Sequence, residues 1–280
     1  MLTGMLHHGV VSTTELHASG LNRVAVAELV ASGRLRKISR GWFATTLAPP
    51  EIVRAVQLGG RLGCLSGCKI HGLWVPPDQA THVLLNPGHS RQHADGVIFH
   101  RVSTPCKSAI ASLEECLAQV IYRHDAETAL IVVESAVEQG LISFTDATAL
   151  VKSAPLRHQR SLQLLQSGAG SGSETRVRLF FQRRNVQVRG QVFIPGVGRV
   201  DLVAGNSLIV ESDSEAHHSN ALDYAEDRRR DLAARELGYE TIRLSYHQIW
   251  MTWEQTQSAL AAQLATGRHR RLPRALSVTR

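Results

Sequence analysis

Three acidic residues stand inside two short runs of apolar residues in the C-terminal half of the chain. Asp201 lies in the run 199–203, and Glu211 and Asp213 lie in the run 208–213. Acidic side chains are poor strand formers and are costly to bury, so strands that contain them need a compensating partner. A hard divalent cation is the simplest such partner, because it prefers carboxylate oxygens as ligands.

The same two runs predict a β-hairpin whose turn contains Gly205-Asn206. Side chains alternate along a strand, so Glu211 and Asp213 share one face. If the loop is three residues long, Asp201 lies opposite Glu211 on that face. The other, apolar face would then be formed by Val200, Leu202 and Val210. The alternative is that the three acids are strand-end carboxylates paired with nearby arginines.

A helix is expected upstream of this hairpin. Ser173 is a suitable N-cap residue, which places Glu174 in the first turn, where the helix dipole favours an anion. This favourable position alone is enough to explain an acidic residue at position 174. The apolar positions of the helix are Val177, Leu179, Phe180 and Phe181.

A second helix is expected downstream, over residues 221–237. It carries Asp227 and the run Arg228-Arg229-Arg230-Asp231, and a charge run on a helix is usually a solvated face. Gly238 fits the position that follows a helix end, and residues 239–245 predict another strand.

The order of these motifs resembles the DUF559 family. Members of that family are related to very short patch repair endonucleases within the PD-(D/E)xK nuclease superfamily. The matching motifs are the Ser-Glu helix, Val-Asp-Leu, Ile-Val-Glu-x-Asp, His-His, Asp-x-x-Arg-Asp, Gly-Tyr and Ile-Arg, over residues 171–250. The resemblance implies a restriction-endonuclease-like αβββαβ core that binds Mg²⁺, with Mn²⁺ as a substitute, and cleaves or nicks DNA.

The resemblance also assigns roles to individual residues. Those matched to the catalytic site are Glu174, Asp201, Glu211, Asp213, His217 and Asp227, and the expected metal ligands are Asp201, Glu211 and Asp213. His217 is the candidate proton-transfer group, because an imidazole titrates near neutral pH. Arg230 or Arg243 is expected to stabilise charge on the phosphate. The chain departs from the pattern at Asp213, where the superfamily usually has lysine, and at Ser214, where glycine is common.

The N-terminal residues predict two short helices followed by a basic hairpin. Ser12 and Glu15 form a capping box for the first helix, and Asn22 is a suitable cap for the second. The apolar positions of the second helix are Val24, Val26, Leu29 and Val30. The hairpin covers residues 34–44 and turns at Ser39-Arg40-Gly41.

Helix, turn, helix and basic hairpin together predict a winged helix-turn-helix domain. The residues expected to contact DNA there are Arg23, Arg34, Arg36, Lys37 and Arg40. Residues 5–48 resemble the N-terminal domain of abortive-infection antitoxins of the AbiEi type. The alternative is that this small domain mediates protein contacts.

The region between residues 49 and 154 yields fewer predictions. Helices are expected over 51–58, 108–123 and 125–139, and strands over 82–86 and 97–102. The region resembles the middle part of AbiEi-like proteins. Its histidines, His71, His82, His89, His93 and His100, are interpreted as too scattered for a metal site. The four cysteines, Cys64, Cys68, Cys106 and Cys116, are interpreted as buried free thiols.

These observations predict an α/β (α+β) protein with three parts. They are a winged helix over 1–48, an AbiEi-like middle α/β domain over 49–165, and a nuclease-like domain over 166–280. Residues 168–173 are expected to form a flexible joint. Residues 268–274 are expected to form a basic tail that adds non-specific DNA affinity.

The composition supports a nucleic-acid partner. Lys and Arg outnumber Asp and Glu by 31 to 24, which gives a net charge of +7. Aromatic residues make up only 5%, which argues against single-strand binding on a stacking platform. The chain lacks a run of about 18 apolar residues and a signal-peptide pattern, so we expect a cytoplasmic protein with no membrane partner.

Taken together, the sequence predicts a Mg²⁺-dependent DNA endonuclease of repair or phage defence. Double-stranded DNA is the expected partner, and a homodimer is compatible with this prediction. The alternative function is a non-catalytic DNA-binding regulator, similar to an antitoxin, that retains a nuclease fold. Action on RNA is a third, weaker alternative.

Overall fold

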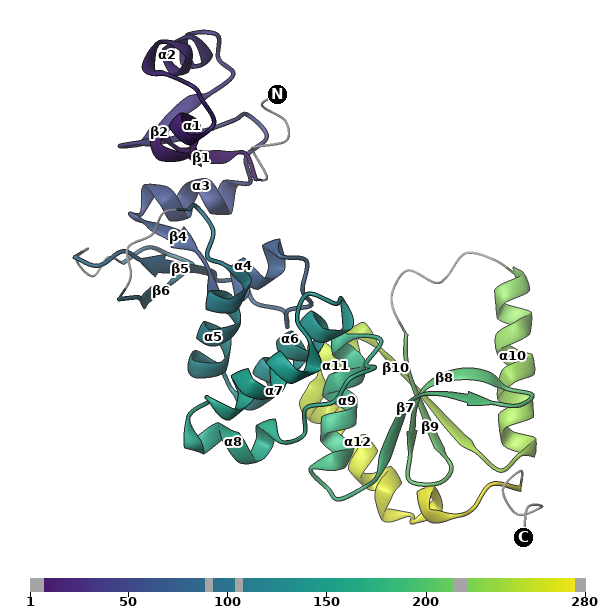
Figure 1. The fold of residues 1–280 in the computed structure, drawn as a ribbon. Helices are drawn as coiled ribbons and strands as arrows, with labels where there is room; N and C mark the ends of the chain where they lie inside the picture. Colours follow the sequence, from purple (N-terminus) through teal and green to yellow (C-terminus); the bar gives the residue numbers. More distant parts are fainter. Residues whose placement is uncertain (1–7, 89–92, 104–107, 214–220, 275–280) are drawn as a thin grey trace. The chain divides into compact units, whose positions relative to one another are not determined.

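The computed structural model describes residues 8–88, 93–103, 108–213 and 221–274 (Figure 1). The chain divides into two compact units, residues 1–124 and 125–280. Both units combine helices with open sheets, so the predicted α/β class is confirmed.

The first unit begins with a small helical subdomain closed by a three-stranded sheet. Its elements are β1 (Val10–Ser12), α1 (Thr13–Ala18), α2 (Arg23–Ala31), β2 (Arg36–Ser39) and β3 (Trp42–Ala44). The strand order is β1-β3-β2, and both pairings are antiparallel. This arrangement fits the predicted winged helix.

The predicted helix caps of this subdomain are confirmed. Ser12 and Glu15 form a capping box at α1, and the side chain of Asn22 accepts a hydrogen bond from Ala25 N at α2. Two of the apolar positions predicted for α2 are wrong, because Val24 is 66% exposed and Val30 is 38% exposed. The buried side of α2 is defined by Val26 and Leu29, and at 100° per residue Val24 lies on the opposite side.

The rest of the first unit is a sheet covered by helices. Its elements are α3 (Pro50–Gln57), β4 (Gly60–Leu62), α4 (Cys64–Ile70), β5 (Thr81–Leu85), β6 (Val97–Arg101) and α5 (Leu113–Arg123). Strand β5 is central, antiparallel to β4 and parallel to β6. Helix α5 begins five residues later than the predicted 108, because Ser112 and Glu115 form a capping box there.

The second unit starts with three helices and continues into an αβββαβ arrangement. The helices are α6 (Ala126–Glu138), α7 (Phe144–Lys152) and α8 (Leu156–Leu162). The core is α9 (Gly172–Gln182), β7 (Val188–Ile194), β8 (Gly198–Ala204), β9 (Leu208–Asp213), α10 (Ala221–Glu236) and β10 (Glu240–Ser245). The described part ends with α11 (Tyr246–Trp250), α12 (Trp253–Ala265) and the 3₁₀ turn Arg268–Arg270.

This core sheet has the strand order β10-β9-β8-β7, with β10 parallel to β9 and the other pairs antiparallel. Helices α9 and α12 cover one face, where Phe180, Phe181 and Leu260 pack against Leu202 and Val210. Helix α10 covers the other face (Figure 1). The predicted order of helices and strands in this core is therefore confirmed.

The predicted hairpin is present, with residues 205–207 as its three-residue loop. Leu202 pairs with Val210 and Ala204 with Leu208, so the register brings Asp201 opposite Glu211. The prediction that Val200 shares a face with Leu202 is wrong, because Leu202 packs in the core beneath α9 whereas Val200 packs in the core beneath α10.

A backbone distortion lies at the same level in the neighbouring strand. Gln191 in β7 has a φ of +50°, a conformation that few residues other than glycine adopt. It lies between Gly190, which pairs with Leu202, and Val192, which pairs with Val200. The change of face between Leu202 and Val200 therefore coincides with a left-handed residue in the paired strand.

The start of α9 also differs from the prediction. Ser171, and not Ser173, is the N-cap residue, because its side chain accepts a hydrogen bond from Glu174 N. Ser173 Oγ instead accepts a hydrogen bond from Trp250 Nε1 at 2.9 Å. Residues 171–173 thus belong to the cap and first turn of α9, and the expected flexible joint does not extend through them.

Within the described ranges, no helix has both the length and the apolar character needed to cross a membrane.

Candidate functional site

Glu174 is held in a buried position in the first turn of α9, with 5% of its surface exposed. Its Oε2 accepts hydrogen bonds from Gly170 N at 2.9 Å and from Gln191 Nε2 at 2.6 Å. Gln191 was not predicted as a site residue, and the sequence contains no signal for its left-handed backbone. The strained Gln191 thus connects the predicted helix acid to the sheet.

Asp201 and Glu211 are linked directly across the hairpin. Asp201 N donates a hydrogen bond to Glu211 Oε2 at 3.2 Å. The Asp201 carboxylate accepts hydrogen bonds from Ser212 N at 2.8 Å and from Ser212 Oγ at 3.1 Å. The register of the hairpin therefore brings together the two acids, as predicted.

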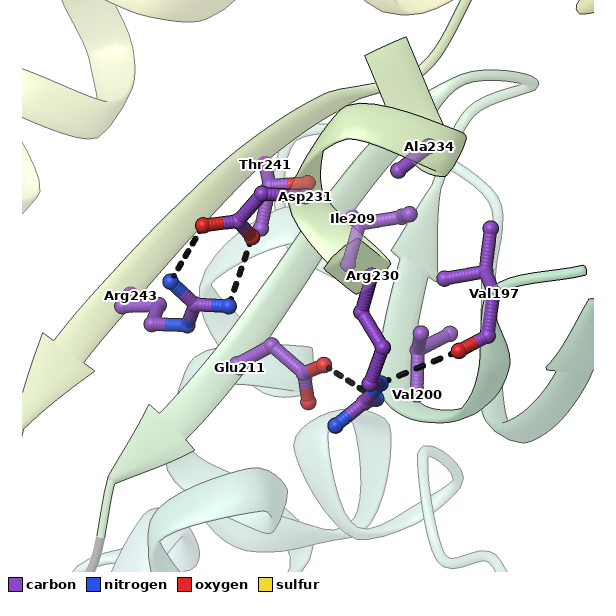
Figure 2. A pocket seen from close by; sticks show the side chains of 9 residues that line it. All are labelled: Val197, Val200, Ile209, Glu211, Arg230, Asp231, Ala234, Thr241 and Arg243. Carbon is purple, nitrogen blue, oxygen red and sulfur yellow. Dashed lines mark hydrogen bonds and ion pairs between the residues drawn. The ribbon is translucent and has the colours of Figure 1, made fainter. Parts of the chain in front are cut away.

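Glu211 also forms an ion pair with Arg230, a residue of α10. Arg230 Nη2 lies 3.2 Å from Glu211 Oε1, and the same guanidinium donates hydrogen bonds to the carbonyls of Val197 and Arg199. Arg243 is instead bound by Asp231 through two hydrogen bonds, at 2.6 and 2.9 Å (Figure 2). Arg230, one of the two predicted phosphate contacts, thus forms an ion pair with a candidate catalytic acid.

A small pocket lies beneath α10 around these side chains. Figure 2 shows Glu211, Arg230 and Arg243 on its polar side, and the remaining lining residues are Val197, Val200, Ile209, Asp231, Ala234 and Thr241. One wall is thus apolar, and the other is formed by charged groups that already have partners.

The charge of Asp201 affects the pKa of both glutamates of the candidate site. Burial raises the pKa of Glu211, and the negative charge of Asp201 raises it further, against the opposing effect of Arg230. Burial also raises the pKa of Glu174. The hydrogen bond from Gln191 opposes that effect, and the charge of Asp201 adds to it. A cation at this place would counteract both increases, so the donor set fits a hard divalent ion.

Of the remaining predicted site residues, the structure describes the side chain of Asp227 but not those of Asp213 and His217. Asp213 is the last residue of β9 and pairs with Ser245 of β10, but its side chain lies outside the described part. His217 lies in the segment 214–220, which is also outside it. Asp227 is exposed on α10 and lies 3.8 Å from Arg230 Nη1. The sharing of one cation by Asp201, Glu211 and Asp213 stays a prediction.

The basic residues of the N-terminal subdomain that were predicted to contact DNA all lie on its surface. Arg23 is the first residue of α2, Arg36 and Lys37 lie on β2, and Arg40 lies in the turn of the hairpin. These four side chains and that of Arg34 are exposed. The surface is thus available to a polyanion.

The interpretation of the middle-region histidines as scattered is wrong for two of them. The Nδ1 atom of His82 lies 2.8 Å from Nε2 of His100. In the described part of the chain, the ligand atoms of His82, His100 and Cys64 all lie within 4.8 Å of one another. Sequence spacing could not reveal this, because three separate elements carry the residues. Cys64, Cys68 and Cys116 are buried free cysteines as predicted, and Cys106 lies outside the described residues.

A comparison with known protein families gave a match to the N-terminal subdomain. Residues 5–46 match a family described as "Transcriptional regulator, AbiEi antitoxin". The N-terminal subdomain is therefore similar to a domain of this type of transcriptional regulator, as the sequence predicted. A comparison with curated proteins gave no match.

Among solved structures, the chain is similar to the crystal structure of the RV2827C protein from Mycobacterium tuberculosis. The sequence identity is 18%, over 64% of this chain and 79% of that chain, with a TM-score of 0.29. A TM-score this low supports no inference about this chain.

Proposed function

We propose that this protein binds double-stranded DNA through its N-terminal winged helix. The observation that carries the proposal is the match of residues 5–46 to AbiEi-type transcriptional regulators. The exposed basic residues at the start of α2 and on the β2–β3 hairpin supply the charge that phosphate contacts require.

The affinity for a DNA duplex at several salt concentrations tests this proposal. Charge reversal of Arg36, Lys37 and Arg40 together should weaken binding and flatten its salt dependence. Each lost phosphate contact should lower the slope of log K against log salt by about 0.9. A matched control reverses Lys152, Arg160 and Arg235, which are exposed and change the net charge equally. If the two triple variants bind alike, the winged helix is not the DNA contact.

We further propose that the C-terminal unit hydrolyses DNA with Mg²⁺. The observation behind this is the proximity of Glu174, Asp201 and Glu211 on an αβββαβ core, where the charge of Asp201 adds to the effect of burial in raising the pKa of both glutamates. Asp201 and Glu211 would hold the ion, together with Asp213. When bound, Mg²⁺ would polarise a phosphoryl oxygen and lower the pKa of a water molecule.

Residues of the chain would orient groups around the ion, contact the phosphate and transfer a proton. Glu174, fixed by Gly170 and Gln191, would orient groups around the ion. Arg230 would exchange its contact with Glu211 for a contact with the phosphate, and His217 would transfer a proton. For His217→Ala we expect a rate reduced by roughly 10²–10⁴ with DNA affinity unchanged.

Nicking of supercoiled plasmid with Mg²⁺, Mn²⁺ or EDTA tests the hydrolytic proposal. Glu211→Ala should abolish nicking. Glu226→Ala, which removes an exposed acid on α10 that is paired with Arg229, should leave it unchanged. Plain, mismatched and modified duplexes should be included, because the substrate preference is open. Wild-type protein that binds these duplexes but never nicks them would contradict the proposal.

A regulator without hydrolytic activity is the second candidate function. It is favoured by the ion pair between Glu211 and Arg230, since this is the pairing expected if the strand acids have a structural role. In that case Glu211→Ala should remove the closer of the two carboxylates that contact Arg230 and lower the stability, and the wild type should bind DNA without turnover.

A further inference from the structure

Cys64, His82 and His100 come from three different elements of the first unit and meet inside it. Val83 and Leu85 of β5 pack with the core beneath α3, so alternation directs His82 to the other face of the sheet. His100 lies on the adjacent parallel strand β6, and Cys64 is the first residue of α4. All three are buried, with exposed fractions of 0%, 0% and 7% for Cys64, His82 and His100.

The donor atoms of Cys64, His82 and His100 lie within 4.8 Å of one another, close enough to converge on one metal ion. In a tetrahedral zinc site, Zn–N bonds of about 2.0–2.1 Å and Zn–S bonds of about 2.3 Å place neighbouring ligand atoms about 3.3–3.6 Å apart. His82 Nδ1 lies 2.8 Å from His100 Nε2, and Cys64 Sγ lies 3.2 Å from Nε2 of His124. His124 thus lies beside the cluster, with its ring centroid 5.2 Å from that of His82.

The carboxylate of Asp78 contacts the ring nitrogen of His82 that does not face His100. Asp78 Oδ2 lies 2.8 Å from His82 Nε2. When Nε2 carries the proton and donates to this carboxylate, the lone pair of Nδ1 faces Cys64 and His100. A carboxylate behind a metal-binding histidine is a recurrent feature of zinc sites, because it fixes the tautomer and the ring orientation.

The backbone of Cys64 supports a role other than packing. Its φ is +50°, in the left-handed region that is costly for a residue with a side chain. Strained residues of this kind cluster at functional sites, where the surrounding structure holds them in place. Gly63 permits the close approach to β5, because a Cβ there would lie 2.5 Å from Leu84 Cγ.

We propose that Cys64, His82 and His100 bind a Zn²⁺ ion, with His124 as the fourth ligand. One soft thiolate and three imidazoles form a donor set that suits zinc. The thiolate and the Asp78 carboxylate together balance the charge of the ion, so the buried site would carry no net charge. The site belongs to the first unit and is independent of the carboxylates in the second unit.

Metal analysis of the full-length wild-type protein tests the proposal directly. Purification without chelator, in the presence of a reductant, should leave about one zinc ion per chain. Replacement of zinc by Co²⁺ should produce the sulfur-to-cobalt charge-transfer absorption that a thiolate ligand causes. Cys64→Ser should remove this absorption, and His100→Ala should lower the metal content. Asp78→Asn should weaken binding by about 10- to 100-fold, because it removes only the orienting carboxylate.

Two variants serve as matched controls. Cys68→Ser changes an equally buried thiol one helical turn later, and His93→Ala changes an exposed imidazole in the same unit. Both should retain the zinc and the cobalt spectrum. His124→Ala should alter the ligand-field bands of bound cobalt, and an unchanged spectrum would exclude His124 from the ligand set.

A measurement on wild-type protein avoids dependence on the folding of the variants. Bound zinc should protect Cys64 from alkylation in mild denaturant, and a chelator should remove that protection, as read by peptide mass spectrometry. Failure of the wild type to bind zinc or cobalt after reconstitution would overturn the proposal. Equal metal content in Cys64→Ser, His100→Ala and the wild type would also overturn it, because the metal would then lie elsewhere.

Discussion

At the scale of single residues, the second unit contains a buried ion pair between Glu134 of α6 and Arg178 of α9. Both oxygens of Glu134 accept hydrogen bonds from Arg178 Nη2, at 2.6 and 2.7 Å. Glu134 also accepts hydrogen bonds from Thr175 Oγ1 and Gln166 N. The exposed fractions of the two charged side chains are only 2% and 4%. The cost of burying two charges is therefore offset by a nearly complete set of hydrogen bonds.

Removal of one member of this pair should be strongly destabilising. Arg178→Met should lower the free energy of unfolding by about 3–5 kcal/mol, because it leaves a buried carboxylate without its partner. Replacing both residues, Glu134→Leu with Arg178→Met, should cost less than Arg178→Met alone. Urea unfolding measures both values.

The control for this prediction is the more exposed Arg183–Glu127 pair. Arg183→Ala should cost about 1 kcal/mol or less, because pairs in contact with solvent contribute little. A loss of similar size from Arg178→Met would mean that the buried pair does not stabilise the α6–α9 contact.

At the scale of secondary-structure elements, the first turn of α9 positions the most deeply buried candidate acid. Ser171 caps this turn, and Gly170 N donates a hydrogen bond to Glu174. A Cβ at Gly170 would lie 2.6 Å from Glu174 Oε1, so a side chain at this position would displace the carboxylate. The cap and the site are therefore one local structure.

Ser171→Ala should lower the stability of the second unit by about 1 kcal/mol, because Glu174 N would lose its hydrogen-bond acceptor. Ser171→Asp should keep the cap. Ser258→Ala is the control, since Ser258 Oγ only donates back to Glu254 O in the exposed middle of α12 and its loss should be close to neutral. Thermal unfolding of the three variants measures these differences, and an unaffected Ser171→Ala would contradict the assigned cap.

At the scale of the whole molecule, the chain consists of two units that contain different functional groups. Residues 1–124 contain the winged helix and the Cys64–His82–His100 cluster, whereas residues 125–280 contain Glu174, Asp201 and Glu211. Each unit has its own apolar core. DNA affinity and hydrolysis should therefore be separable by cutting the chain between His124 and Asp125.

The fragment 1–124 should retain duplex binding with its salt dependence, and the fragment 125–280 should unfold cooperatively on its own. Magnesium-dependent nicking by the second fragment should be weaker than in the whole chain, because the winged helix no longer raises the local DNA concentration. Anisotropy, calorimetry and plasmid nicking measure these properties. Duplex binding that resides only in fragment 125–280 would contradict the proposed division.

The sequence alone determined the features that depend on neighbours in the chain. Ser12 with Glu15, Asn22 and Gly238 predicted helix ends correctly, because caps are local structures. The hairpin register followed from a three-residue loop and strand alternation, which placed Asp201 opposite Glu211. The winged helix followed from the order of short elements and basic residues.

The tertiary structure decided what depends on groups that are distant in the sequence. Arg230 reaches Glu211 from another element, and His82, His100 and Cys64 meet only because α4, β5 and β6 pack together. Val200 and Leu202 pack in different cores, although strand alternation predicted one face for both, and the left-handed Gln191 lies at the same level of the neighbouring strand. Alternation and capping act over a few residues, whereas strained backbone and buried polar clusters persist only where the packed core supplies the energy that holds them.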